Sequence, residues 1–215
     1  MGSALMNVWK KCAAGVLLLV LALPAWAQNI LLVGDSISAA FGLEIQQGWV
    51  TLLQQRLQQQ GYPHRVVNAS VSGDTTAGGL ARLPALLSEH QPQLVVIELG
   101  GNDGLRALPL GNMQQNLSAM VEQAQTAGAQ VIVLGMRIPP NYGPRYTHAF
   151  EQVFRDVAQQ HDVALLPFLL EGVGGVEGMM QNDGVHPTAA AQPLLLDNAW
   201  PLVQQWLDSG YSKTD

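Results

Sequence analysis

Residue types suited to nucleophilic catalysis occur in three stretches of the N-terminal half of the chain. Ser36 ends the stretch Gly34-Asp35-Ser36, and its hydroxyl could act as a nucleophile if a base takes its proton. Gly73 could offer an unobstructed backbone N–H, and the Asn102 amide could donate to an oxyanion, with the N–H of Ser36 as a third donor. The plainer interpretations are a helix N-cap for the serine, a turn residue for the glycine and an Asx turn for the asparagine.

A candidate base stands near the other end of the chain. The stretch Asn182-Asp183-Gly184-Val185-His186-Pro187 places His186 three residues after Asp183 on one tight loop. The carboxylate could bind one ring nitrogen, fix the tautomer and support the imidazolium that forms when the other nitrogen takes the Ser36 proton. The plainer interpretation is a loop histidine with a capping aspartate. A metal pair is a third, poorer interpretation, because no further ligand cluster accompanies the two residues.

The other histidines have no such neighbourhood, and we interpret them as surface residues. They are His64, His90, His148 and His161.

The hydrophobic pattern predicts a scaffold that could bring these residues together. Apolar runs typical of buried strands alternate with stretches of helical periodicity, which implies right-handed crossovers and a mostly parallel sheet covered on both faces. We predict an α/β protein: a single-domain three-layer α/β/α sandwich with a flavodoxin-like parallel sheet of about five strands in the order 2-1-3-4-5. Strands are predicted at 30–33, 65–69, 94–99, 131–134 and 163–166, and helices at 45–60, 78–89, 113–126, 147–160 and 187–207. The last helix is expected to be kinked or split at Pro193 and Pro201.

The first three predicted strands each run into a polar turn that contains glycine. In a parallel sheet these turns share one edge, and strands 1 and 3 flank the point where a crevice opens. Ser36, Gly73 and Asn102 should therefore converge although they are far apart in the sequence. If Ser36 opens a helix, the first N–H groups of that helix point to the same place.

The N-terminus has the pattern of an export signal. A basic pair, Lys10 and Lys11, precedes the apolar run 13–23, and Ala25-Trp26-Ala27 is a small-x-small cleavage site. We expect a signal peptide over residues 1–27, cleavage after Ala27, and a periplasmic or secreted mature domain over residues 28–215, with a retained anchor as the alternative. The only cysteine, Cys12, lies in this segment, so the mature domain would have no disulfide and no thiol nucleophile.

Composition limits the class of protein further. The 215 residues are 48% hydrophobic and 12% charged, which is typical of one folded domain. The formal net charge of −6 argues against a nucleic-acid partner. We expect a small-molecule substrate, no membrane span after signal cleavage, and a monomer.

Taken together, the four polar blocks resemble those of the SGNH hydrolases, the GDSL family of lipases and esterases. The blocks are 34–36, 73–74, 100–103 and 183–186, and the longer stretches 34–39, 72–79 and 137–143 look like the exported TesA-type enzymes. The resemblance implies an SGNH hydrolase fold over residues 28–215. It also implies Ser36 as nucleophile, His186 as base, Asp183 as its orienting acid, and an oxyanion hole made by Ser36, Gly73 and Asn102, with no cofactor and no metal.

The resemblance also suggests where substrate binds. The loop 138–146 matches a mobile segment that lines the acyl groove in the family. The predicted substrate-binding residues are Asp35, Asp74, Thr75, Ile138, Pro139 and Tyr142. Asp35 and Asp103 are also expected to brace their turns by hydrogen bonds to nearby backbone N–H groups.

The function implied is that of a serine esterase acting through an acyl-enzyme on carboxylic esters and thioesters: aryl esters, acyl-CoA-type thioesters and lysophospholipids. A carbohydrate O-acetylesterase on the same fold is the first alternative. A flavodoxin-like ligand-binding protein without catalysis is the second. A nucleotide or flavin binder would need a phosphate-cradling loop after the first strand, and Asp35 stands where a phosphate would be repelled.

Overall fold

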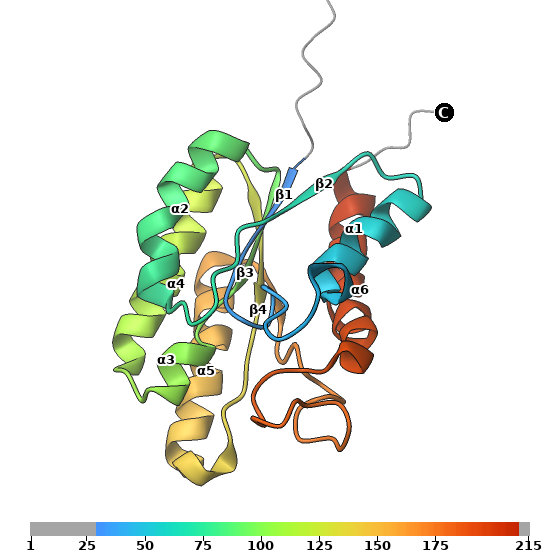
Figure 1. Cartoon of the computed structure of the whole chain (residues 1–215). Coiled ribbons are helices and arrows are strands. Elements are labelled where there is room, and N and C mark those ends of the chain that lie inside the picture. The colour runs from blue at the N-terminus through green and yellow to red at the C-terminus, as the bar shows by residue number, and fades with distance from the viewer. Residues whose placement is uncertain (1–28, 211–215) are drawn as a thin grey trace, which may run out of the picture.

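A five-stranded parallel sheet forms the centre of the molecule, with helices on both of its faces (Figure 1). The computed structural model describes residues 29–210, so the predicted signal peptide and its cleavage site lie outside the described residues. The strands are Asn29–Gly34 (β1), Arg65–Asn68 (β2), Leu94–Glu98 (β3), Gln130–Leu134 (β4) and Ala164–Leu166 (β5). Their order in the sheet, β2-β1-β3-β4-β5, confirms the predicted fold class and topology.

Two groups of helices cover the sheet. The helices are Trp49–Gln59 (α1), Thr76–His90 (α2), Gly101–Leu105 (α3), Leu110–Thr126 (α4), Pro144–His161 (α5) and Gln192–Gly210 (α6). Helices α1 and α6 pack together on one face, whereas α2, α4 and α5 pack side by side on the other (Figure 1). Short 3₁₀ turns at Ile45–Gln47 (η1), Pro140–Tyr142 (η2) and Ala189–Ala191 (η3) lie within the connections.

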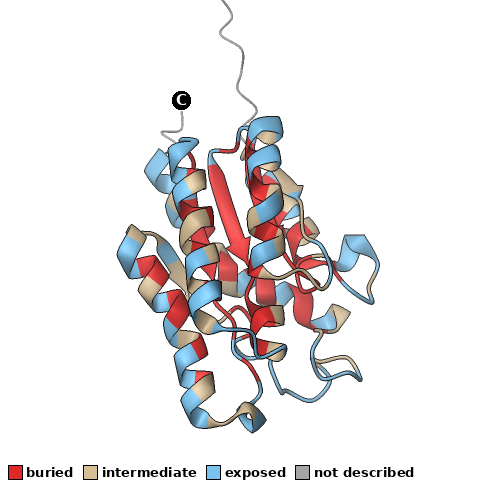
Figure 2. Cartoon of the chain, turned by 90° about the vertical axis from the view of Figure 1, so that its left-hand side faces the viewer, coloured by how far each residue is buried: buried red, intermediate tan, exposed pale blue. Residues whose placement is uncertain are grey.

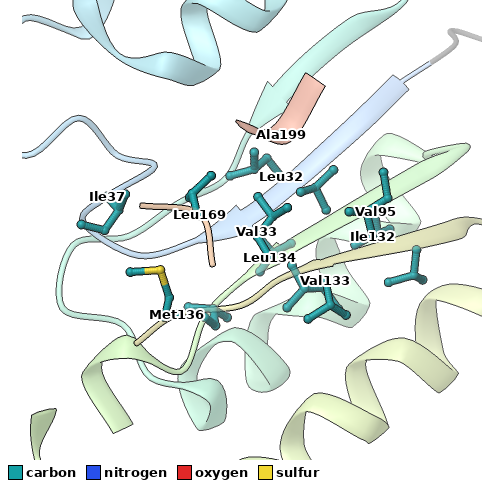
Figure 3. Close-up of a cluster of buried hydrophobic side chains, with 14 of the residues drawn as sticks. Leu32, Val33, Ile37, Val95, Ile132, Val133, Leu134, Met136, Leu169 and Ala199 are labelled. Carbon is teal, nitrogen blue, oxygen red and sulfur yellow. The ribbon is translucent and has the colours of Figure 1, made fainter. Parts of the chain in front are cut away.

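The core lies where the central strands meet the inner faces of the helices. Every residue of β1 and of β3 is buried, as expected for parallel strands that are covered on both sides (Figure 2). Burying each large aliphatic side chain of this kind stabilises the fold by about 1.5–3 kcal/mol. Near the carboxyl ends of the strands the cluster includes Ile37 and Met136 (Figure 3). The part of the sheet edge that carries the polar blocks is therefore supported by closely packed apolar side chains.

Several predicted element boundaries are wrong, and glycine or proline explains two of them. The predicted helix 45–60 is divided at Gly48, which has an extended backbone and ends η1 before α1 begins. The predicted helix 187–207 begins later, because Pro187 pairs with Met180 in an isolated antiparallel bridge and α6 starts at Gln192. Proline in the first turn of α6 loses no intrahelical hydrogen bond.

Two further expectations need correction. The stretch that follows β3 was predicted as a turn, but residues Gly101–Leu105 form the short helix α3. The prediction that His64 is a surface residue is wrong, since it is only 4% exposed and its ring lies edge-on to Trp206 at 5.1 Å between centroids. Burial lowers the pKa of this imidazole.

Candidate active site

The candidate nucleophile lies in a tight turn directly after β1. Ala39 N donates to the Asp35 carbonyl at 2.9 Å, and Phe41 N donates to the Ser36 carbonyl at 3.1 Å. This segment forms no regular helix, so the possibility that Ser36 opens a helix is not realised. A Cβ at Gly34 would lie 2.8 Å from the Glu98 Oε2 atom, which explains why glycine is needed immediately before the turn. The turn leaves Ser36 only 8% exposed.

Ser36, His186 and Asp183 form one continuous chain of hydrogen bonds. The Ser36 Oγ atom is 2.8 Å from His186 Nε2, and His186 Nδ1 is 2.7 Å from Asp183 Oδ2. The nucleophile and the imidazole are 150 residues apart in the sequence, and only the fold brings them together. The predicted juxtaposition over one edge of the sheet is therefore present.

Charge on Asp183 decides which nitrogen of the imidazole carries the proton. The backbone N–H groups of His186 and Val185 donate to Asp183 Oδ1 at 3.0 and 2.9 Å, and together with the His186 ring they lower the pKa of Asp183 to about 2. An ionised carboxylate only accepts hydrogen bonds, so Nδ1 must be the protonated nitrogen. Nε2 is then free to accept the Ser36 proton.

The segment that carries the imidazole is clamped to the segment that carries Ser36. The Gln181 side-chain amide donates to the Phe41 carbonyl at 2.8 Å and to the Pro187 carbonyl at 3.0 Å. The Phe41 ring packs against the His186 ring at a tilt of 35°, with 4.4 Å between ring centroids. These contacts join the loop after β1 to the loop before α6, and they restrict rotation of the imidazole.

Of the three predicted oxyanion donors, one is held by a carboxyl group. Asn102, on α3, donates from Nδ2 to Asp35 Oδ2 at 3.1 Å. Gly73 sits in a turn with φ of +79°, where a residue with a Cβ would be strained. Within residues 29–210, the backbone N–H groups of Ser36 and Gly73 have no hydrogen-bond acceptor. Both therefore remain available to a ligand.

The expected bracing by Asp35 and Asp103 is confirmed. Asp35 Oδ1 accepts from the Ile37 N–H at 3.0 Å. Asp103 accepts from the N–H of Thr76 at 2.9 Å and from its hydroxyl at 2.6 Å, which ties α3 to the first turn of α2. The block 100–103 is thus connected to the stretch 72–79 through one buried carboxylate.

A second buried carboxyl group, Glu98, lies beneath the Ser36 turn. Its Oε2 atom accepts from the Ser38 hydroxyl at 2.7 Å and from the Asp35 N–H at 3.3 Å, and Ser38 in turn accepts from the Trp49 indole at 3.2 Å. Burial raises the pKa of Glu98 well above its ordinary value and, more modestly, raises the pKa of Asp35 to about 6. The sequence reasoning missed Glu98, although an acid at the end of an apolar strand was a usable signal.

A cleft of about 640 Å³ opens beside Ser36 and His186, with apolar walls from the loops after β4 and β5. Of the predicted substrate-binding residues, Asp35, Ile138 and Pro139 line it. The wall also includes Leu105, Met136, Arg137, Phe168, Leu170 and Met180. Phe168, Leu170 and Met180 were not predicted, because they lie in an irregular loop without periodicity.

The remaining predicted substrate-binding residues do not line this cleft. Asp74 is paired with Arg82 at 2.8 Å, and the hydroxyl of Thr75 accepts from the Gly78 N–H at the start of α2. The Tyr142 hydroxyl donates to the Leu105 carbonyl at 2.7 Å. All three side chains support the site's loops in this structure.

In the range 29–210, no cluster of three or more histidine, aspartate or glutamate side chains has the arrangement needed to hold a metal ion. In the same range, no helix is both long and apolar enough to cross a membrane.

A parallel α/β sheet with a hydroxyl, an imidazole and a carboxylate in series at its edge is an arrangement typical of hydrolases that act through a serine. Residues 32–193 match the GDSL-like Lipase/Acylhydrolase family, so the chain belongs to this family and is an ester hydrolase.

Individual relatives agree with this assignment. Esterase TesA of Pseudomonas aeruginosa is 62% identical over 190 residues, which cover 88% of this chain and 94% of the relative. Thioesterase 1/protease 1/lysophospholipase L1 of Escherichia coli K12 is 43% identical, with 80% of this chain and 82% of the relative covered. A crystal structure of TesA superposes with a TM-score of 0.82 at 63% identity, covering 83% of this chain and 99% of that one.

Proposed function

We propose that the chain is an exported serine esterase in which Ser36 is the nucleophile, His186 the base and Asp183 the residue that orients the base. The observation that carries the proposal is the unbroken chain from Asp183 Oδ2 through both ring nitrogens to Ser36 Oγ, at 2.7 and 2.8 Å. The separation of the two reacting side chains is already within the range needed for proton transfer.

The proposed reaction has two acyl-transfer steps. His186 Nε2 takes the Ser36 proton while Oγ bonds to the substrate carbonyl carbon, and the carbonyl oxygen becomes an oxyanion held by Ser36 N–H, Gly73 N–H and Asn102 Nδ2. The tetrahedral intermediate collapses, and the imidazolium protonates the departing alcohol or thiol. A water molecule, deprotonated by His186, then attacks the acyl-enzyme and releases the acid and free Ser36.

The cleft supports substrates with an extended acyl chain. Its apolar wall beside Ser36 and its volume of about 640 Å³ suit a hydrocarbon chain better than an acetyl group. The relatives' names include esterase, thioesterase and lysophospholipase. We therefore assign acyl-CoA-type thioesters, aryl esters and lysophospholipids as the substrate classes.

Labelling with a fluorophosphonate tests the nucleophile. We expect the wild-type protein to be labelled once, at Ser36, and the Ser36→Ala variant to be unlabelled. Ser88→Ala, an exposed serine on α2, is the matched control and should label like the wild type. Labelling of Ser36→Ala at the wild-type rate would place the nucleophile elsewhere, and an unlabelled wild type would remove the serine mechanism.

A kinetic series on esters with acyl chains of two to sixteen carbons tests the substrate class. We expect kcat/KM to rise with chain length beyond the acetyl ester, since added methylenes contact the apolar wall. The same series includes acetylated sugars. A preference for those sugars over all longer acyl esters would instead support a carbohydrate O-acetylesterase.

Export of the protein is the remaining part of the proposal. Its basis is the signal pattern of residues 1–27, with its small-x-small site at Ala25-Trp26-Ala27. Expression of the full chain in a Gram-negative host should yield a periplasmic or secreted protein whose first residue is Gln28. Recovery of an uncleaved chain in the membrane fraction would show a retained anchor.

A further inference from the structure

Arg106 joins the two segments that supply the proposed oxyanion donors. It ends α3, one helical turn after Asn102. A single guanidinium nitrogen, Nη2, donates to the Gly73 carbonyl at 2.8 Å and lies 3.4 Å from the Asn102 Oδ1 atom. The bond to Gly73 spans 33 residues of sequence, from the end of α3 to the loop after β2.

At Gly73, the guanidinium supplies one of the two hydrogen bonds that hold the peptide group after this residue. The N–H of Asp74 donates to the Val71 carbonyl at 3.0 Å, so the peptide between Gly73 and Asp74 is bonded at both ends. Glycine with a positive φ has wide conformational freedom. Among residues 29–210, and apart from its chain neighbours, the guanidinium nitrogen is the only heavy atom within 4 Å of the position where a Cβ of Gly73 would stand. The bond therefore holds the residue whose own N–H is left free.

At Asn102, the guanidinium and the Asp35 carboxyl group together determine which way the amide faces. The amide oxygen faces Arg106 at 3.4 Å, and the amide nitrogen donates to Asp35 Oδ2 at 3.1 Å. A flipped amide would place its NH₂ against a guanidinium, which only donates, and its oxygen against the carboxyl oxygen of Asp35. One Nδ2 hydrogen is used by Asp35, and the second stays available for the oxyanion.

We propose that Arg106 is a positioning residue that keeps both Gly73 and Asn102 oriented toward the reacting carbonyl oxygen. This inference rests on the oxyanion role proposed above. Arg106 is exposed and does not line the cleft, so it acts through its two partners and makes no contact with the acyl chain. Its contribution is to preorganise donors that would otherwise have to be ordered during the reaction.

Steady-state kinetics of Arg106→Ala and Arg106→Gln test the proposal. We expect kcat to fall by about tenfold to a hundredfold, the range that a misplaced catalytic group produces, while KM stays within about twofold. The rate of fluorophosphonate labelling should fall in parallel, and Arg106→Lys should recover part of the loss because it keeps one donor. Arg155→Ala, an exposed arginine on α5, is the matched control and should behave as the wild type.

A double-mutant cycle tests whether Arg106 acts through Asn102. Arg106→Ala should lower kcat by a smaller factor in the Asn102→Ala background than in the wild type, because one partner of Arg106 is already removed. Fully multiplicative losses would overturn this route, as would an unchanged kcat in both Arg106→Ala and Arg106→Gln. A fully active Asn102→Ala variant would instead overturn the proposed oxyanion hole itself, so the two failures are distinguishable.

Discussion

The carboxyl groups around Ser36 occupy two opposite environments. Asp183 is solvent-exposed and accepts three hydrogen bonds, which lower its pKa to about 2. Glu98 is fully buried and Asp35 nearly so, and burial raises the pKa of both. The exposed group is thus suited to carry a fixed charge beside the imidazole, and the buried ones to support the turn that holds Ser36.

Asp183→Asn should lower kcat by about a thousandfold with little change in KM. The amide keeps the shape of the carboxyl group, but it no longer stabilises the imidazolium or requires the proton to sit on Nδ1. Because the wild-type carboxyl has a pKa of about 2, it remains ionised from pH 4 to pH 9, so no inflection in the activity profile over that range belongs to it. Kinetics of both proteins across this range are the measurement. A loss smaller than tenfold would contradict the assigned role.

Glu98→Gln should change how stability depends on pH. The folded pKa of Glu98 is raised above its ordinary value of 4.5, so the native state keeps a proton that the unfolded chain releases above that pH. The contribution of Glu98 to the free energy of unfolding therefore falls as the pH rises from about 4.5 toward the folded pKa. Urea unfolding at pH 5 and pH 8 should show the wild type losing stability relative to Glu98→Gln. Equal pH dependence in the two proteins would show that the buried carboxyl is ionised.

At the scale of elements, the short helix α3 decides where Asn102 lies. A helix of five residues is too short to be stable alone, so its place depends on packing against its neighbours. Gly104 allows this close approach, since a Cβ there would lie 2.6 Å from the Phe150 ring and 2.7 Å from the Ile138 side chain. The Tyr142 hydroxyl holds the next residue by its carbonyl.

Gly104→Ala should displace α3 and lower both stability and kcat. The added methyl group overpacks a filled site, which costs about 1–3 kcal/mol, and the displacement moves Asn102. Gly111→Ala on α4 is the matched control, because nothing lies within 4 Å of the position of its Cβ. Alanine in that exposed helical position should leave kcat unchanged and raise stability by about 0.5–1 kcal/mol. Thermal unfolding and kinetics of the pair are the check, and equal effects of both substitutions would contradict the packing argument.

At the scale of the whole molecule, few large apolar side chains remain exposed. Among the described residues they are Phe41, Ile45, Val71, Leu108, Val176 and Val185, all located in the connections between strands and helices rather than on the outer faces of the long helices. Exposed apolar residues in such small number are common on monomeric proteins.

We therefore expect the mature protein to be a monomer in solution. Light scattering coupled to size-exclusion chromatography at micromolar concentration should give the mass of a single chain. A stable dimer would show that these side chains, or residues outside 29–210, form an interface.

The sheet order and the polar blocks could be predicted because both depend on local patterns in the sequence. Buried strands read as short apolar runs, helices as periodic ones, and alternation of the two restricts the topology to very few solutions. That topology then places the polar blocks, which follow the strands, at one edge of the sheet. Boundaries were less predictable where tertiary contacts decide them, as at Pro187, which pairs with Met180 and does not begin α6.

By itself, therefore, the sequence determined that a hydroxyl, an imidazole and a carboxylate occur in blocks that a parallel sheet brings to one edge. Only the tertiary structure decided that Arg106 bridges the Gly73 and Asn102 segments, that Glu98 lies under the Ser36 turn, and which side chains line the cleft. The physical reason is that these contacts join side chains from segments far apart in the chain. The distances between these side chains depend on how the elements pack against one another. The periodicity within a single segment carries no information about that packing.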